Sequence, residues 1–144
     1  MTDTITMSRE FLDEIIFYCK EIYPDEACGL LAGKTGSVEK IYKITNIRHS
    51  SFNYEMDAIE QLRCEKTIRK AGLKIIGIYH SHPTSSAYPS QLDIMRVYWP
   101  GDPDMPIYPD ACHVIVGLIG GVTEVKAFMI NSRQKISEIK LNII

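Results

Sequence analysis

The sequence predicts a single-domain α/β protein, residues 1–144, built on a mixed β-sheet. Three observations support this prediction. The length of 144 residues suits one domain with one core. Hydrophobic residues make up 45% and charged residues 24%, which is the balance of a globular protein. Helical and strand periodicities alternate along the chain, and hairpins occur beside longer crossovers, which indicates a mixed sheet with helices packed on it.

The first third of the chain predicts one helix and one hairpin. Ser8 is suited to cap a helix that Pro24 ends, because apolar residues recur between them at helical spacing: Phe11, Leu12, Ile15, Ile16, Cys19 and Ile22. The run "ACGLLAG" (27–33) is typical of a short buried strand, and "VEKIYKITNI" (38–47) alternates as a second strand does. With a turn around Gly36 between them, 27–47 is expected to form a hairpin.

The rest of the chain predicts two helices and four strands. A helix is expected from about Asp57 to Ala71, with Gly72 as its stop, and another from Ser90 through "SQLDIMRVYW" (90–99). "KIIGIYHSH" (74–82) is apolar on both faces, as a central strand is. Prolines at every third residue predict an extended, polyproline-like loop: Pro100, Pro103, Pro106 and Pro109. The last three strands are expected at 112–119, 122–130 and 135–144, the first two joined at Gly120-Gly121.

Charge and composition exclude several function classes. The net charge of −2 offers no basic surface for nucleic acid or an anionic membrane. The basic residues of the second helix are expected to form a solvated face: Lys66, Arg69 and Lys70. The N-terminus lacks the pattern of a secretory signal, and no apolar run approaches a membrane span. Four cysteines without a C-x-x-C pair predict reduced thiols and a cytoplasmic location.

The segment "HSHPTSSAYPSQLD" (80–93) carries the clearest chemical pattern. His80 and His82 are two apart at the end of a strand, so both side chains point to one face. The loop after Pro83 is long enough to bring Asp93, in the first turn of the next helix, back over the strand end. Two histidines and one carboxylate leave one tetrahedral position open, which is the pattern of a catalytic zinc site.

Structural explanations also exist for each part of this segment. Ser90-x-x-Asp93 is a helix capping pattern, and an isolated H-x-H is usually accidental. Capping and metal binding are compatible, because the helix turn can anchor both side chains. Other metal templates fit less well: the deaminase and H-E-x-x-H patterns are absent, and the H-x-H-x-D-H type would need an aspartate where Thr84 stands.

Other chemically competent residues are expected to be structural. His113 begins an apolar strand and is predicted to be a core or edge histidine, whereas His49 lies in a polar loop and is predicted to be exposed. Cys28 is expected to be a small core residue, although it lies close enough to Glu26 to face a site. Trp99 either covers one side of a substrate groove or packs against the fold.

The spacing His80-Ser81-His82-Pro83, seven residues, Ser90, then Asp93 resembles the JAMM signature of the MPN-plus (JAB-like) metallopeptidases, most closely the short stand-alone prokaryotic type. "EACGLL" (26–31) resembles the upstream glutamate segment of that family, so the resemblance spans about residues 26–130. The family's fold is a curved mixed β-sheet flanked by helices, related to cytidine deaminases. This resemblance therefore implies an MPN fold and a zinc-dependent isopeptidase, similar to deubiquitinases.

The resemblance also implies roles for individual residues. His80, His82 and Asp93 would hold one zinc ion per chain. Glu26 would take a proton from the attacking water and pass it to the leaving amine, and Ser90 would donate a hydrogen bond to the oxyanion. The residues by themselves do not select Glu26 among the glutamates of the chain; only the family pattern does.

The same resemblance implies a protein substrate. Family members cleave a peptide, isopeptide or amino-acid adduct bond after the C-terminal Gly-Gly of a ubiquitin-like or sulfur-carrier protein. Two alternatives stay open at this point: a non-catalytic MPN scaffold, and a zinc amidohydrolase that acts on a small amide. Neither nucleic acid nor membrane is an expected partner, and a homodimer is the default assembly.

Overall fold

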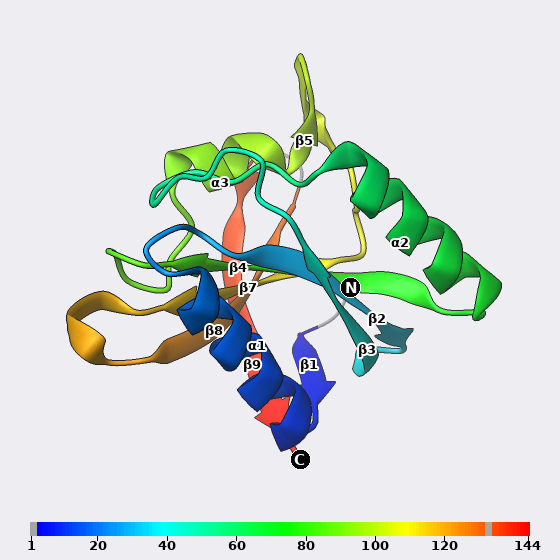
Figure 1. Cartoon of the computed structure of the whole chain (residues 1–144). Helices are drawn as coiled ribbons and strands as arrows, with labels where there is room; N and C mark the ends of the chain where they lie inside the picture. The colour runs from blue at the N-terminus through cyan, green and yellow to red at the C-terminus, as the bar shows by residue number, and fades with distance from the viewer. Residues whose placement is uncertain (1–2, 132–133) are drawn as a thin grey trace.

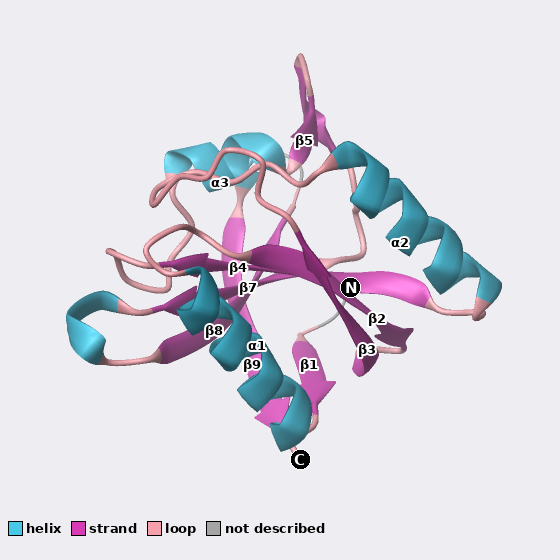
Figure 2. Cartoon of the chain, in the orientation of Figure 1, coloured by secondary structure: helices cyan, strands magenta, loops and turns pink. Residues whose placement is uncertain are grey.

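The structure is a computed structural model that describes residues 3–131 and 134–144. Three α-helices and nine strands follow one another along the described chain (Figure 1 and Figure 2). The elements are β1 (Thr4–Met7), α1 (Arg9–Ile22), β2 (Cys28–Lys34), β3 (Ser37–Ile44), α2 (Ala58–Lys70), β4 (Lys74–His82), α3 (Gln91–Arg96), β5 (Tyr98–Trp99), β6 (Asp102–Pro106), β7 (Cys112–Gly117), the 3₁₀ turn η1 (Ile119–Gly121), β8 (Glu124–Ile130) and β9 (Ile136–Ile143).

Seven strands form one mixed sheet in the order β1-β3-β2-β4-β7-β8-β9. The α/β class and the mixed sheet predicted from the sequence are therefore confirmed. The sheet curls far enough to close, because β1 and β9 pair in parallel, with Thr4 opposite Lys140. Strand β4 lies between β2, which is antiparallel to it, and β7, which is parallel. Strand β4 is apolar on both faces because it lies in the centre of the sheet and both of its faces are covered.

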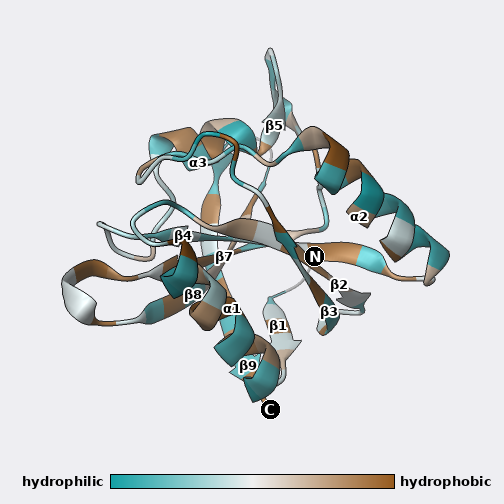
Figure 3. Cartoon of the chain, viewed as in Figure 1, coloured by the Kyte–Doolittle hydropathy of each residue, from teal (hydrophilic) through white to brown (hydrophobic). Residues whose placement is uncertain are grey.

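The two faces of the sheet have separate cores. Leu31 and Tyr79 pack on one face together with Leu12, Ile15 and Cys19 of α1. Their neighbours Leu30 and Ile78 point to the opposite face and pack with Ile68 of α2. Helix α1 is amphipathic, with hydrophobic and hydrophilic residues on different sides (Figure 3). From Ile78 onward, the even-numbered residues of β4, which include His80 and His82, therefore share the face that α2 covers.

The predicted starts of α1 and α2, and the predicted end of α2, are confirmed by hydrogen bonds and backbone angles. Ser8 Oγ accepts the Phe11 N–H at 3.1 Å, and the Asp57 carboxylate caps the first turn of α2. Gly72 follows α2 with a φ of +73°, a conformation that favours glycine. The basic face of α2 is exposed, as predicted: Lys66, Arg69 and Lys70. All four cysteines are free thiols.

Two regions differ from the prediction. The helix that begins after Ser90 was expected to continue to Trp99 but ends at Arg96, because Tyr98–Trp99 pair with Asp102–Pro106. The proline-rich segment therefore forms an edge hairpin, which projects from the barrel (Figure 1), rather than a polyproline-like loop. Proline is tolerated on an edge strand because one side of that strand needs no N–H donor.

Strand β1 was not predicted at all. Within the described residues, the helices are too short or too polar to span a membrane.

Candidate metal centre and active site

The end of β4 and the start of β2 bring the predicted site residues together. Cys28 pairs with His80 across the two antiparallel strands. Immediately beyond this pair, Ala27 and Ser81 are joined by two hydrogen bonds, Ala27 N–H to Ser81 Oγ at 2.8 Å and Ser81 N–H to the Ala27 carbonyl at 3.0 Å. Continued pairing places Glu26 beside His82, and the two-residue periodicity of strands puts Glu26, His80 and His82 on one face.

Three ligand atoms converge at this strand end. The Nε2 atoms of His80 and His82 are 3.1 Å apart, and they lie 3.1 and 2.9 Å from Asp93 Oδ2. All three side chains are buried. The predicted His-His-Asp cluster therefore exists as a geometric unit, and it is a group able to hold a metal ion.

The chemistry of these donors fits a metal ion. His82 Nδ1 lies 2.7 Å from the Ser86 carbonyl, which can only accept, so Nδ1 carries a proton and Nε2 is the ring nitrogen directed at Asp93. A proton joins Nε2 to the carboxylate oxygen in the metal-free protein, and a metal ion can take the place of that proton. Ligands about 2.0–2.1 Å from a tetrahedral zinc lie about 3.3 Å from one another, close to the observed separations.

The electrostatics of the cluster keep Asp93 ionised. Burial opposes its charge, but the positive charge that His80 can carry, together with hydrogen bonds from both histidines and from the Ser90 N–H, holds its pKa well below the usual range. Burial likewise disfavours the charged form of His82, yet hydrogen bonds to Asp93 and to the Ser86 carbonyl raise its pKa. Asp93 is thus available as an anionic ligand throughout the neutral range.

The helix cap at Ser90 also fixes Asp93. Ser90 Oγ accepts the Asp93 N–H at 3.1 Å, and the Ser90 N–H donates to Asp93 Oδ2 at 2.8 Å, which completes a capping box. Ser90-x-x-Asp93 is therefore a helix cap, as the structural explanation of this pattern predicted. The same Asp93 oxygen reaches both histidines, so capping and a ligand geometry coexist in one side chain.

Close packing of the 83–89 loop holds the Ser86 carbonyl against His82. Gly117 lies beneath the loop, and a Cβ there would come within 2.8 Å of the Ala87 nitrogen. The Ala87 N–H also donates to Glu124 Oε1 at 3.2 Å. Only glycine permits this approach, and the fixed carbonyl in turn orients the His82 ring, as partners of metal-binding histidines do.

Glu26 lies next to the cluster in an environment that favours its protonated form. It is 2% exposed, and its Oε1 has no hydrogen-bond partner among the described residues. Burial raises its pKa to about 8, helped by the negative charge of Asp93. Its backbone is fixed from both sides, since the Asn46 side chain donates to the Glu26 carbonyl and the Glu26 N–H donates to Ser50. A buried carboxyl group whose pKa lies near neutrality is suited to proton transfer.

The remaining candidates take the structural positions expected of them. His113 is buried on β7 outside the cluster, and burial lowers its pKa to about 4. His49 is exposed. Cys28 is fully buried, and its Sγ lies 3.4 Å from the Ile44 carbonyl. Trp99 is exposed at the edge hairpin, so it is not a packed core residue.

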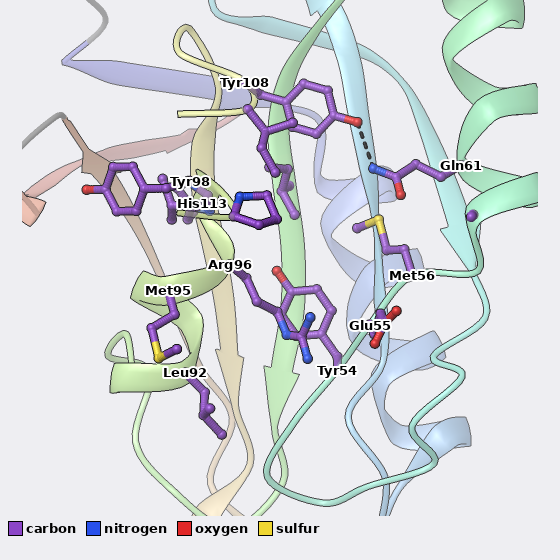
Figure 4. Close-up of a pocket in the computed structure, with 15 residues that line it drawn as sticks. Tyr54, Glu55, Met56, Gln61, Leu92, Met95, Arg96, Tyr98, Tyr108 and His113 are labelled. Atoms are coloured by element: carbon purple, nitrogen blue, oxygen red, sulfur yellow. Dashed lines mark hydrogen bonds between the residues drawn. The ribbon is translucent and has the colours of Figure 1, made fainter. Parts of the chain in front are cut away.

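A cavity of about 530 Å³ lies between α2, α3 and the edge hairpin (Figure 4). Its lining is mainly apolar and includes Tyr54, Met95, Tyr98 and Tyr108, with Arg96 among them. Tyr54 also stacks on His80, with ring centroids 4.7 Å apart, so the Tyr54 ring lies between this cavity and the cluster of His80, His82 and Asp93, which do not line the cavity themselves. Sequence reasoning missed Tyr54 and Arg96, because neither belongs to a recognisable spacing pattern.

The raised pKa of Glu26 predicts how the metal-free protein responds to pH. The pKa is about 8 in the folded state and 4.5 without the protein environment, so the folded state keeps a proton that the unfolded state releases. The free energy of unfolding therefore falls as pH rises from about 4.5 to 8, by about 1.4 kcal/mol for each step of one in pH. We expect urea unfolding with a chelator present to show a steeper loss in wild type than in Glu26→Gln, where only groups such as His82, whose pKa is also raised, still contribute. Parallel pH profiles for the two proteins would contradict it.

Comparison with known proteins extends these observations. A family model described as prokaryotic homologs of the JAB domain matches residues 8–131. The CysO-cysteine peptidase of Mycobacterium tuberculosis is 32% identical over 114 residues, which cover 78% of this chain and 72% of that protein. The desampylase of Pyrococcus furiosus is 32% identical over 117 residues, 81% of this chain and 74% of that protein.

A solved structure confirms the fold that the JAMM resemblance implied. AF2198, a JAB1/MPN domain protein from Archaeoglobus fulgidus, superposes with a TM-score of 0.59 at 20% identity and covers 99% of each chain. At this identity the likeness concerns the fold alone. Together with the family match over most of the sequence, it supports one conclusion: this chain belongs to the prokaryotic homologs of the JAB domain, with the MPN fold.

Proposed function

We propose that this protein is a zinc-dependent hydrolase that cleaves a peptide, isopeptide or amino-acid adduct bond after the C-terminal Gly-Gly of a ubiquitin-like or sulfur-carrier protein. The observation that carries the proposal is the convergence of two histidine nitrogens and one carboxylate oxygen within 3.1 Å, beside a buried glutamate with a raised pKa. Relatives named CysO-cysteine peptidase and desampylase support this substrate class.

His80, His82 and Asp93 would hold one zinc ion per chain, with a fourth position open to substrate. When bound, zinc polarises a carbonyl group and lowers the pKa of water toward about 7. The nitrogen and oxygen donors suit zinc, and the buried setting strengthens every charge interaction in the site. Four free cysteines are compatible with a reducing compartment, and we propose the cytoplasm as its location.

Glu26 would act as the general base and then as the general acid. As a carboxylate it accepts a proton from the attacking water, and as a carboxylic acid it delivers that proton to the leaving nitrogen. Its pKa is about 8 in the metal-free protein, and the positive charge of a bound zinc would lower that value, so both forms are within reach near neutral pH. The hydrogen bonds at its backbone carbonyl and N–H hold Glu26 in place beside the cluster, near enough for Asp93 and His82 to act on its charge.

Ser90 would stabilise the oxyanion. Its Oγ accepts a backbone N–H from Asp93, which leaves the hydroxyl hydrogen free to donate. The hydroxyl therefore has a fixed oxygen position at the edge of the cluster and one donor to offer. Such a donor is typically worth about 3 kcal/mol in the transition state.

The adjoining cavity supports an extended polypeptide tail as substrate. The cavity is mainly apolar and large enough for several residues of chain. Tyr54 forms part of its wall and stacks on His80. Glycines at the cleaved end have no side chains, so they could pass close to the buried cluster without clashes. A small amide would leave most of this cavity unused.

A panel of carriers tests the substrate proposal. Ubiquitin-like and sulfur-carrier proteins ending in Gly-Gly would be prepared with a cysteine adduct, a short peptide extension or a lysine isopeptide. Intact mass spectrometry would detect release of the free Gly-Gly end by the zinc-loaded protein. Cleavage of a short Gly-Gly peptide amide at the rate of the full carriers would favour a small-amide hydrolase. No cleavage of any substrate by zinc-loaded protein would favour a scaffold.

Replacement of Ser90 by alanine separates its two roles. The lost cap bond is expected to cost about 1 kcal/mol of stability. The Ser90 backbone N–H still holds Asp93 Oδ2, so zinc content should not change. Loss of the oxyanion donor is expected to lower kcat by about 10²-fold or more. Kinetics would be measured where both proteins are fully folded, and a near-normal kcat would restrict Ser90 to capping.

A further inference from the structure

The two histidines of the metal cluster are held in different ways. His82 has the hydrogen-bond partner that metal-binding histidines usually have, because its Nδ1 meets the Ser86 carbonyl at 2.7 Å. His80 Nδ1 is buried and has no such partner among the described residues. His80 Nε2 contacts Asp93 at 3.1 Å, but a single bond from Cβ allows an imidazole to rotate, and no hydrogen bond at Nδ1 holds the other side of the ring. Packing against the ring face is therefore needed to fix its plane.

The Tyr54 ring occupies the position that would fix it. The two ring centroids are 4.7 Å apart and their planes meet at 27°, which is a stacked arrangement. Tyr54 is only 8% exposed, so it has little room to move away. Rotation of the His80 ring about its Cβ–Cγ bond would drive one ring edge into the tyrosine face.

Tyr54 is itself held by charged and polar neighbours. The Arg96 guanidinium lies 5.9 Å from the centre of the Tyr54 ring. Arg96 in turn donates from Nε and Nη2 to Asn53 Oδ1, at 3.2 and 3.1 Å. The Asn46 side chain holds the segment 53–55 from a second side, because it donates to the Asn53 carbonyl and accepts the Glu55 N–H. The segment that carries Tyr54 is thus tied at the residues on either side of it.

We propose that Tyr54 is a positioning residue that orients His80 for metal binding through its ring face, with Arg96 securing the tyrosine. This inference rests on the proposed function, because it takes His80 as a ligand. In the view of Figure 4 the Tyr54 ring lies between Arg96 and the segment that bears Glu55, with its hydroxyl directed into the cavity. The stacking face, not the hydroxyl, is therefore the part that acts on His80.

Three variants distinguish stacking from other roles of Tyr54. Tyr54→Leu removes the ring, Tyr54→Phe keeps the ring and removes only the hydroxyl, and Arg96→Met keeps an unbranched apolar stem while removing the guanidinium. Tyr98→Leu is the matched control, because Tyr98 is a tyrosine of similar burial that lines the same cavity but packs with Ile94, Val97 and Ile130.

The measurement is metal binding, independent of catalysis. Zinc affinity would be determined by competition with a chelator, and cobalt(II) would replace zinc as a visible-absorption probe of coordination geometry. Tyr54→Leu is expected to weaken zinc binding by about 10–100-fold, the usual effect of losing a residue that orients a ligand. Its cobalt spectrum should change. Tyr54→Phe should match wild type in both measurements, Arg96→Met should be intermediate, and Tyr98→Leu should bind zinc as wild type does.

Each outcome decides a different question. Wild-type affinity and spectrum in a folded Tyr54→Leu protein would overturn the inference while leaving the metal site intact. Equal weakening in Tyr54→Phe and Tyr54→Leu would also overturn it, since the ring face is kept in the first. If Tyr54→Leu does not fold, the comparison of Arg96→Met with Tyr98→Leu still tests the stack, and equal zinc affinity in those two would count against it. Failure of wild type to bind either metal would instead refute the proposed metal centre.

Discussion

Replacement of Glu26 by glutamine is expected to lower turnover by about 10²–10⁴-fold while the protein keeps its zinc. Glutamine has nearly the same size and can still hydrogen-bond to water. It cannot take a proton as a carboxylate does or deliver one to a leaving nitrogen. Because Glu26 stands outside the His80, His82 and Asp93 cluster, metal content should stay at the wild-type level. Substrate binding should persist or tighten, since the ionised fraction of Glu26 no longer places negative charge near the carbonyl group of the substrate.

The control for this experiment is Glu39→Gln on β3. Glu39 is exposed and distant from the cluster in the sheet register, so turnover should match that of wild type. Metal analysis and kcat would be measured on the same preparations of both variants. A Glu26→Gln protein with normal zinc and normal kcat would mean that another group is the base. Loss of zinc would instead mean that Glu26 belongs to the metal shell.

Removal of either histidine ligand is expected to abolish both metal binding and activity. Purified wild type should contain about one zinc per chain, whereas His80→Ala and His82→Ala should contain almost none. Two remaining donors cannot complete a tetrahedral site of three protein ligands and one open position. Removing zinc from wild type with a chelator should have the same effect on activity, reversed when zinc is restored.

A buried histidine outside the cluster provides the matched control. His113→Gln changes a side chain that is buried like His82 but is not part of the ligand group, so this variant should retain its zinc. Elemental analysis of chelator-free preparations would decide, with circular dichroism to verify folding. Full zinc content in a His80→Ala, His82→Ala double variant would show that the ligands have been wrongly assigned.

Several parts of the site could be predicted from the sequence because they depend on local geometry. His80 and His82 alternate with Ser81 along a strand, so their shared face follows from the two-residue period. Asp93 lies in a helix turn that Ser90 opens, and its reach back toward the strand end depends on a short loop. Glu26 needed the JAMM resemblance, because what marks it physically is burial beside Asp93, and burial is a property of the assembled fold.

The sequence by itself determined the first two helices with their caps, the start of the third, the 27–47 hairpin, the central strand and the shared face of His80 and His82, since each depends on residues close together in the chain. Only the tertiary structure decided the closure of the barrel, because the four residues of β1 gain their partners on β9 from the far end of the chain. It also decided the edge hairpin of Tyr98–Trp99 and Asp102–Pro106, where cross-strand pairing overrides the extended preference of the prolines. The contact of Tyr54 with His80 is also decided by the tertiary structure. The two rings come from distant parts of the chain, and no spacing pattern in the sequence indicates that they will stack.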